Sequence, residues 1–214
     1  MKKILTAVLL SCFVMLQASP GLAEDARGSN DGNTTAVQVV EGLHQLLLKA
    51  MKTGKDTSCP ERFRMLQTYI LKSFDFPLIS RIVLGRYWRK MDEKKRHEFV
   101  EAFSRMTIAT YAERFDSYSG ESFKTKGSSL DPRGHLRVET VLVKKDGEQI
   151  SLDYTCRNTG GHWKIVSVSA RGVNDLSLKR ADYSSFLKRH TIDELIAKLK
   201  DQAQKCIPPK GSKR

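Results

Sequence analysis

Residues 74–118 read FDFPLISRIVLGRYWRKMDEKKRHEFVEAFSRMTIATYAERFDSY, and their apolar and aromatic side chains recur at helical spacing. The pattern predicts a long helix that Asp92 caps and that runs to about Ser117. Ile108 and Phe115 lie outside the main apolar stripe of this helix, so the apolar arc is wider than one packing partner requires. A wide arc indicates burial between two layers, or one layer together with a ligand. Ordinary core packing is the simpler interpretation.

Shorter helices are expected on both sides of the long one. Thr34 or Thr35 can cap the first of them, Pro60 occupies the first turn of the second, and Gly85 ends the third. The five expected segments run approximately from 35 to 51, 60 to 71, 76 to 84, 181 to 188 and 192 to 199.

The apolar period changes from helical to two after Gly120, which predicts β-strands. Lys145-Asp146-Gly147 is a hairpin turn signal between two of them. The expected strands cover 121–129 at an edge, then 136–143, 150–156 and 163–170. The predicted fold class is therefore α+β, with helices packed on a small, strongly twisted antiparallel sheet of about four strands that encloses an apolar cavity.

The N-terminus resembles a cleaved export signal. Lys2 and Lys3 precede an apolar run that is too short to span a bilayer, and small residues follow up to Ala23. Cys12 gives an alternative, a lipoprotein signal, although the apolar run continues beyond it. We expect a signal peptide over 1–23, a mobile leader over 24–33, a single domain over 34–206 and a disordered basic tail over 207–214, in a periplasmic protein.

The chain has a formal net charge of +13. For an exported protein we expect no nucleic-acid partner, so the charge favours transient contact with an anionic membrane surface. The basic residues are dispersed, which is typical of a solvated cationic surface.

Three cysteines follow the predicted cleavage site, and in an oxidising compartment one disulfide with one buried thiol is the simplest assignment. Cys156 lies in an expected strand and would be the buried thiol. Cys59 and Cys206 flank helices near the two ends of the domain, so a disulfide between them is possible. The sequence does not determine the pairing.

The sequence carries no evident catalytic or metal-binding motif. The five histidines are scattered, and no nucleophile elbow or Gly-rich phosphate loop occurs. We therefore expect no cofactor, no metal site and no enzymatic activity.

The order of several short motifs resembles the periplasmic phospholipid carriers of the Mla lipid-asymmetry system, the MlaC or toluene-tolerance family. The similarity covers nearly the whole exported chain, although 176–183 is closer to a branch associated with hopanoid biosynthesis. The motifs are Phe74-Asp75-Phe76, Val83-Leu84-Gly85 with Trp88, Phe99 with Phe103 and Tyr111, Trp163-Lys164-Ile165, Gly172-Val173, Leu176-Ser177-Leu178, Tyr183 with Phe186, and 193–199.

The resemblance implies a soluble carrier that shuttles phospholipid between an inner-membrane ABC-type complex and an outer-membrane lipoprotein complex. A periplasmic adaptor without ligand and a lipid-modifying enzyme are the alternatives. We hypothesise that the acyl chains lie between the sheet and the helices. The expected lipid-binding residues are Leu142, Ile150, Leu152, Tyr154, Trp163 and Ile165 from the sheet, with Val83, Phe103 and Tyr111 from the helices.

Overall fold

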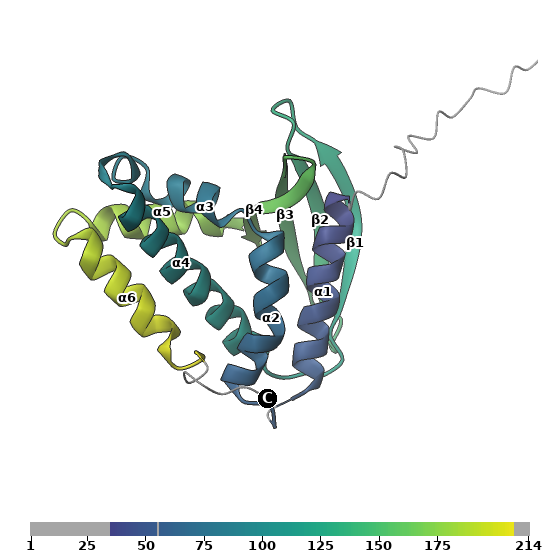
Figure 1. Cartoon of the computed structure of the whole chain (residues 1–214). Helices are drawn as coiled ribbons and strands as arrows, with labels where there is room; N and C mark the ends of the chain where they lie inside the picture. Colours follow the sequence, from purple (N-terminus) through teal and green to yellow (C-terminus); the bar gives the residue numbers. More distant parts are fainter. Residues whose placement is uncertain (1–34, 55, 208–214) are drawn as a thin grey trace, which may run out of the picture. The chain divides into compact units, whose positions relative to one another are not determined.

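The computed structural model describes residues 35–54 and 56–207, so the predicted signal peptide, leader and most of the tail lie outside the described residues. Helices cover one face of an open antiparallel sheet whose strands follow one another in chain order (Figure 1). The helices are α1 (Ala36–Lys52), α2 (Cys59–Ser73), α3 (Phe76–Leu84), the 3-10 helix η1 (Trp88–Lys90), α4 (Glu93–Arg114), α5 (Asp175–Phe186) and α6 (Ile192–Gln204). The strands are β1 (Ser122–Leu130), β2 (Leu136–Val143), β3 (Gln149–Thr159), β4 (His162–Ala170) and β5 (Val173–Asn174). This arrangement confirms the α+β class.

Short polar side chains fix where the helices begin. The side chain of Thr35 accepts a hydrogen bond from the Gln38 amide, and Asp75 and Asp92 accept from amides in the first turns of α3 and α4. Each cap satisfies an amide that has no partner within its helix. The predicted start of α4 and both ends of α3 are therefore reproduced.

The structure differs most from the prediction between β4 and α5. Gly172, with φ of 78°, turns the chain back so that Val173 and Asn174 form a fifth, two-residue strand. The Asn174 side chain then accepts a hydrogen bond from the Ser177 amide at 3.0 Å. This cap starts α5 at Asp175, well before the expected position near 181.

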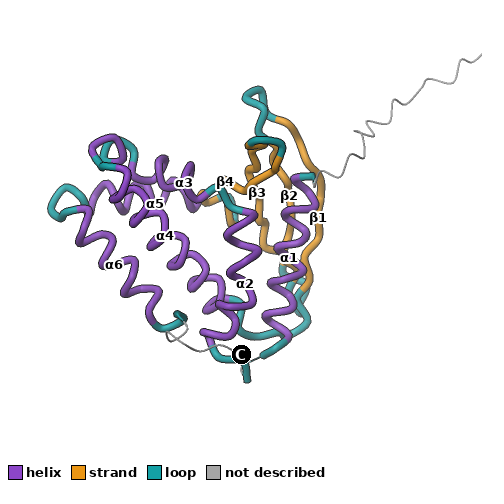
Figure 2. The backbone as a smooth tube through the Cα atoms, in the orientation of Figure 1, coloured by secondary structure: helices purple, strands orange, loops and turns teal. Residues whose placement is uncertain are grey.

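The helices differ in how they meet the sheet. α1 packs across strands β1 to β4, and α2, α3 and α5 each contact β4. α4 packs mainly against α2 and α6, so it faces the sheet through side chains rather than through close backbone contact. The tube drawing shows α4 running between α2 and α6 (Figure 2).

A β-bulge changes the side-chain alternation in β4. Cys156 pairs with Ile165 and Thr155 with Ser167, which leaves Val166 as an extra residue in β4. Beyond the bulge, Val168 pairs with Tyr154 and lies with it on the helix-covered face of the sheet. The odd-numbered neighbours of Val168 lie on the other face.

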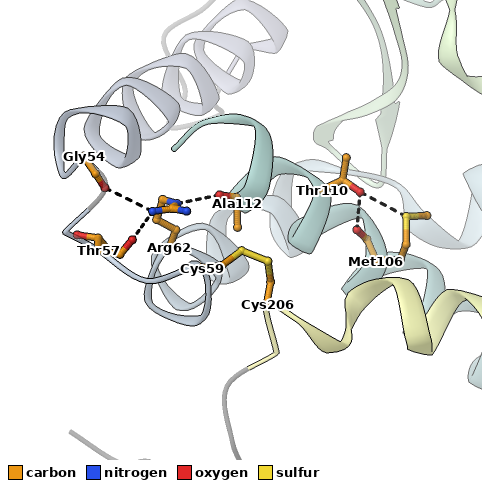
Figure 3. The surroundings of a disulfide bond; sticks show 8 residues. All are labelled: Gly54, Thr57, Cys59, Arg62, Met106, Thr110, Ala112 and Cys206. Carbon is orange, nitrogen blue, oxygen red and sulfur yellow. Dashed lines mark hydrogen bonds between the residues drawn. A yellow bond between two sulfur atoms is a disulfide. The ribbon is translucent and has the colours of Figure 1, made fainter. Parts of the chain in front are cut away.

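A disulfide and a buried arginine tie the ends of several helices together (Figure 3). Cys59, at the start of α2, is bonded to Cys206, which follows α6. Nearby, the Arg62 Nε donates a hydrogen bond to the Ala112 carbonyl at 2.8 Å, and Nη1 donates to the carbonyls of Gly54 and Thr57. Arg62 therefore joins the loop after α1 to the last turn of α4, whose carbonyls lack partners within the helix.

We expect Arg62→Met to lower the free energy of unfolding by about 3 kcal/mol, because the buried Ala112 carbonyl and two half-buried carbonyls lose their donor. Chemical denaturation measures the change. Lys72→Met, at an exposed position of the same helix, is the control and should stay within about 0.5 kcal/mol of the native protein. Equal stability of the two variants would contradict the role given to Arg62.

Reduction of the disulfide should lower the free energy of unfolding by about 3–5 kcal/mol, because the bond closes a long loop and restricts the unfolded chain. The two cysteines are 147 residues apart. A double Cys59→Ala and Cys206→Ala variant should have the stability of the reduced protein and show no response to reductant. The third cysteine of the described part, Cys156, is buried, and burial raises the pKa of its thiol to about 12. A native-state thiol assay should therefore detect little reaction.

Candidate functional site

A cavity of about 380 Å³ lies between α4, the ends of β3, β4 and β5, and α5. Aliphatic and aromatic side chains form most of its wall, and polar groups gather at the α5 side. The lining residues are Met106, Thr107, Thr110, Tyr111, Arg114 and Phe115 of α4 and its end, Leu152, Tyr154, Val168, Ala170 and Val173 of the sheet, and Asp175, Leu178 and Lys179 of α5.

Two threonines of α4 contribute methyl groups to this wall without leaving a hydroxyl unpaired. The Thr107 hydroxyl donates to the Phe103 carbonyl and the Thr110 hydroxyl to the Met106 carbonyl, each at 2.9 Å. Because the hydroxyls bond within their own helix, the polar atoms need no partner across the cavity. The helix face toward the sheet is therefore less polar than its sequence indicates.

Aromatic side chains form a continuous series of contacts around the cavity. Tyr111 lies edge-on to Phe74 and stacked on Phe115, with ring centroids 6.1 and 5.8 Å apart. Phe74 in turn stacks on Phe76, and Phe76 meets Phe103 edge-on at 6.1 Å. These rings span the space between α4 and the sheet, since they are large and have few rotamers.

A smaller hollow of about 50 Å³ continues the cavity inward beneath α3. Phe74, Phe76, Ile79 and Phe103 line it. Thr107, Tyr111, Val168, Asp175 and Lys179 border both spaces. The α4 and α3 walls of the smaller hollow are apolar near Phe103, and the charged residues that reach it come from α5.

A buried histidine holds one wall of the cavity. Nε2 of His44, on α1, lies 3.0 Å from the Tyr154 hydroxyl, and its ring stacks on Phe123 at 4.1 Å between centroids. Burial lowers the pKa of His44 to about 4, so its ring is neutral at neutral pH and Nε2 can accept a hydrogen bond from the hydroxyl. Burial also raises the pKa of Tyr154 well above its usual value. The pair is thus a neutral hydrogen bond that fixes the Tyr154 ring.

The predicted lipid-binding residues separate into two groups. Phe103, Tyr111, Leu152 and Tyr154 lie at the two connected hollows. Val83 and Ile165 are fully buried in the protein core, and Trp163 packs against that core. Leu142 and Ile150 pair with each other on the helix-covered face of the sheet, outside the residues that line the cavity.

Several lining residues were absent from the sequence prediction, and each has a physical reason. The bulge at Val166 hides Val168 and Ala170 from strict alternation beginning at Trp163. The early start of α5 brings Asp175 and Lys179 to the opening. Phe115 did carry a signal, because it lies outside the apolar stripe of the long helix.

One group of possible metal ligands occurs among the described residues. Atoms of Cys59, Glu113 and Cys206 lie within 4.8 Å of one another, but both sulfurs are used by the disulfide. The described helices include none that is long and apolar enough to cross a membrane.

Comparison with known proteins identifies the family. The model of the family described as MlaC protein matches residues 41–201, from α1 through most of α6. The chain belongs to the MlaC family. The matched range includes every residue that lines the cavity.

Two individual relatives add to this assignment. The chain is 26% identical over 184 residues to toluene tolerance protein ttg2D of Pseudomonas putida, covering 84% of this chain and 82% of the relative. A solved structure of the phospholipid-binding protein from Ralstonia solanacearum, in complex with a phospholipid, matches with a TM-score of 0.69 and 18% identity. The match covers 80% of this chain and 98% of that one, and it shows that the two share the MlaC fold.

We expect acidification from pH 7 to pH 5 to lower the free energy of unfolding by about 2 kcal/mol through His44. The unfolded residue takes up a proton near pH 6.5, whereas the folded one does so only near pH 4. Stability from this group is therefore present above pH 6.5 and is lost as the pH falls toward 4.

In His44→Gln, the loss of unfolding free energy between pH 7 and pH 5 should be smaller than in the native protein by about 2 kcal/mol. Denaturation curves at both pH values measure it. His97→Gln, at an exposed position of α4, should keep the full difference. The same pH dependence in both variants would remove His44 as its source.

Proposed function

We propose that this MlaC-family protein is a soluble periplasmic carrier that holds the acyl chains of a phospholipid in the cavity between α4, the sheet and α5. The apolar cavity is the observation that carries the proposal. The presence of a phospholipid in the similar Ralstonia protein, named as phospholipid-binding, supports the choice of ligand.

The energetics of transfer require such a cavity. Each methylene removed from water is stabilised by about 0.8 kcal/mol, so a two-chain lipid crosses an aqueous space extremely slowly by itself. A protein cavity that is similarly dry replaces the bilayer during transfer. The cavity must not bind the chains much more tightly than the bilayer does, or the lipid would not be released.

The size of the cavity also bears on the cargo. A volume of about 380 Å³ holds roughly a dozen groups the size of a water molecule, and a methylene is of similar size. The described conformation therefore has room for most of one acyl chain. Binding of a two-chain lipid requires α5 and the Val173 end of the sheet to move outward, or the second chain to occupy the neighbouring hollows.

The proposed location and partners come from the family and the predicted export signal. We propose that an inner-membrane ABC-type complex and an outer-membrane lipoprotein complex exchange lipid with this carrier, which needs no nucleotide of its own. The positive charge of the chain supports transient contact with anionic membrane surfaces.

Both alternatives are less well supported. An adaptor without ligand predicts a filled interior, whereas the space beneath the sheet is open. For an enzyme, the described residues that line the main cavity offer no histidine, cysteine or serine as nucleophile or base. We therefore propose binding and release without chemical change.

Protein purified from a bacterial periplasm should contain about one phospholipid per chain, measured by mass spectrometry of extracted lipid. Leu152→Trp should reduce the amount at least fivefold, because the indole would fill the space beside Tyr154. Ser151→Trp is the matched control, since the neighbouring residue is exposed and points to the opposite face of β3.

Native protein that is free of lipid and takes none from vesicles would overturn the proposal. So would equal lipid content in the two tryptophan variants when both are folded by circular dichroism. Conversion of the lipid to a new product would indicate an enzyme.

A further inference from the structure

A second hollow, of about 370 Å³ and polar, adjoins the apolar cavity between α4, α5 and α6. Met106, Thr110, Arg114 and Lys179 border both spaces, so the two meet along these four residues. The rest of the polar hollow is formed by Glu113, Asp182, Tyr183, Lys198 and Gln202. The two long cationic side chains, Arg114 and Lys179, therefore lie where the apolar and polar surfaces meet.

These cations differ in their existing interactions. Arg114 is exposed and forms no hydrogen bond or ion pair with the residues that the structure describes. The Lys179 Nζ lies 3.5 Å from an oxygen of Asp175, and the Lys198 Nζ lies 4.8 Å above the Phe186 ring. Arg114 thus has all its donors available to a ligand, and Lys179 has donors left over from one ion pair.

Polarity increases in one direction along the cavity-lining face of α4. Phe103 lies at the inner hollow, Tyr111 borders both the inner hollow and the main cavity, and Arg114 ends the helix at the polar hollow. No hydrogen bond from the Tyr111 hydroxyl to another described residue is present. Asp175 and Lys179 of α5 also border the inner hollow, so the gradient belongs to the α4 wall. A ligand with apolar tails and a polar head matches this wall when its tails point toward Phe103.

We propose that Arg114 and Lys179 bind the phosphate of the phospholipid, with its headgroup in the polar hollow and its tails directed toward Phe103. This inference rests on the carrier function proposed above. A guanidinium can donate two parallel hydrogen bonds to phosphate, and the lysine ammonium adds a second positive charge.

The charges around the site also restrict the headgroup. Arg114, Lys179 and Lys198 are balanced by Asp175, Glu113 and Asp182 across the two hollows. A phosphate joined to an ammonium group matches this mixture, because each charge of the headgroup finds opposite charges nearby. The structure therefore favours a zwitterionic phospholipid.

The test compares two lipids that share their acyl chains and differ in the phosphate headgroup. Lipid-free protein is incubated with vesicles of dioleoylphosphatidylcholine that contain a minor share of dioleoylglycerol, and is then repurified. Mass spectrometry gives the ratio of the two lipids bound. Arg114→Gln with Lys179→Gln should lower the ratio of phospholipid to diacylglycerol about tenfold, while total acyl-chain binding persists.

The control replaces two exposed cations far from the site. Lys124 and Lys126 lie on β1, at the sheet edge opposite β5. The double variant Lys124→Gln with Lys126→Gln should leave the lipid ratio unchanged. An unchanged ratio in the Arg114 and Lys179 variant would overturn the headgroup assignment but not the carrier function. Native protein that binds neither lipid would overturn both.

Free phosphate could bind the same two cations as the phosphate of a lipid headgroup. Titration of lipid-free protein with inorganic phosphate distinguishes these two ligands. We expect no measurable heat, because the headgroup site depends on tails held in the adjoining cavity. Binding of free phosphate that disappears in the Arg114 and Lys179 variant would assign the site to phosphate alone and overturn the lipid assignment.

Discussion

The cavity depends on a series of aromatic contacts that keeps α4 at a distance from the sheet. From Phe103 the contacts pass through Phe76 and Phe74 to Tyr111, and then through Phe115 and Phe123 to His44 and Tyr154. Aromatic rings are large and rigid, so they hold the two layers too far apart for smaller side chains to interlock. The space that remains is apolar because most of the groups around it are ring edges, aliphatic chains and methyl groups.

An unfilled cavity costs packing energy, and other parts of the domain must supply stability. The disulfide and Arg62 lie together at the ends of α2, α4 and α6, and α4 carries one wall of the site. α1 covers strands β1 to β4 and contributes His44, which fixes Tyr154 from the opposite wall. The strongest constraints therefore surround the cavity without occupying it.

Local sequence signals predicted most of the fold. Asp75 and Gly85 mark α3, Asp92 marks the start of α4, and alternation with turn residues marks the hairpin strands. The bulge at Val166 and the two-residue strand β5 were missed because they depend on pairing between strands, which no local pattern specifies. The same limitation explains the candidate site: Phe103, Tyr111, Leu152 and Tyr154 lie at the hollows, whereas Val83 and Ile165 are equally apolar but face packed neighbours. Arg114 and Lys179 had no local signal, because only the meeting of α4 and α5 brings them to one opening.

The separation of Cys59 from Cys206 has a consequence for biogenesis. The second sulfur follows α6, so the bond can close only after nearly the whole domain has been synthesised. Until then Cys59 stays available to wrong partners, and a chain truncated within α6 would keep a reactive thiol. Oxidation therefore distinguishes completed molecules from interrupted ones, and the domain becomes fully stabilised only in an oxidising compartment.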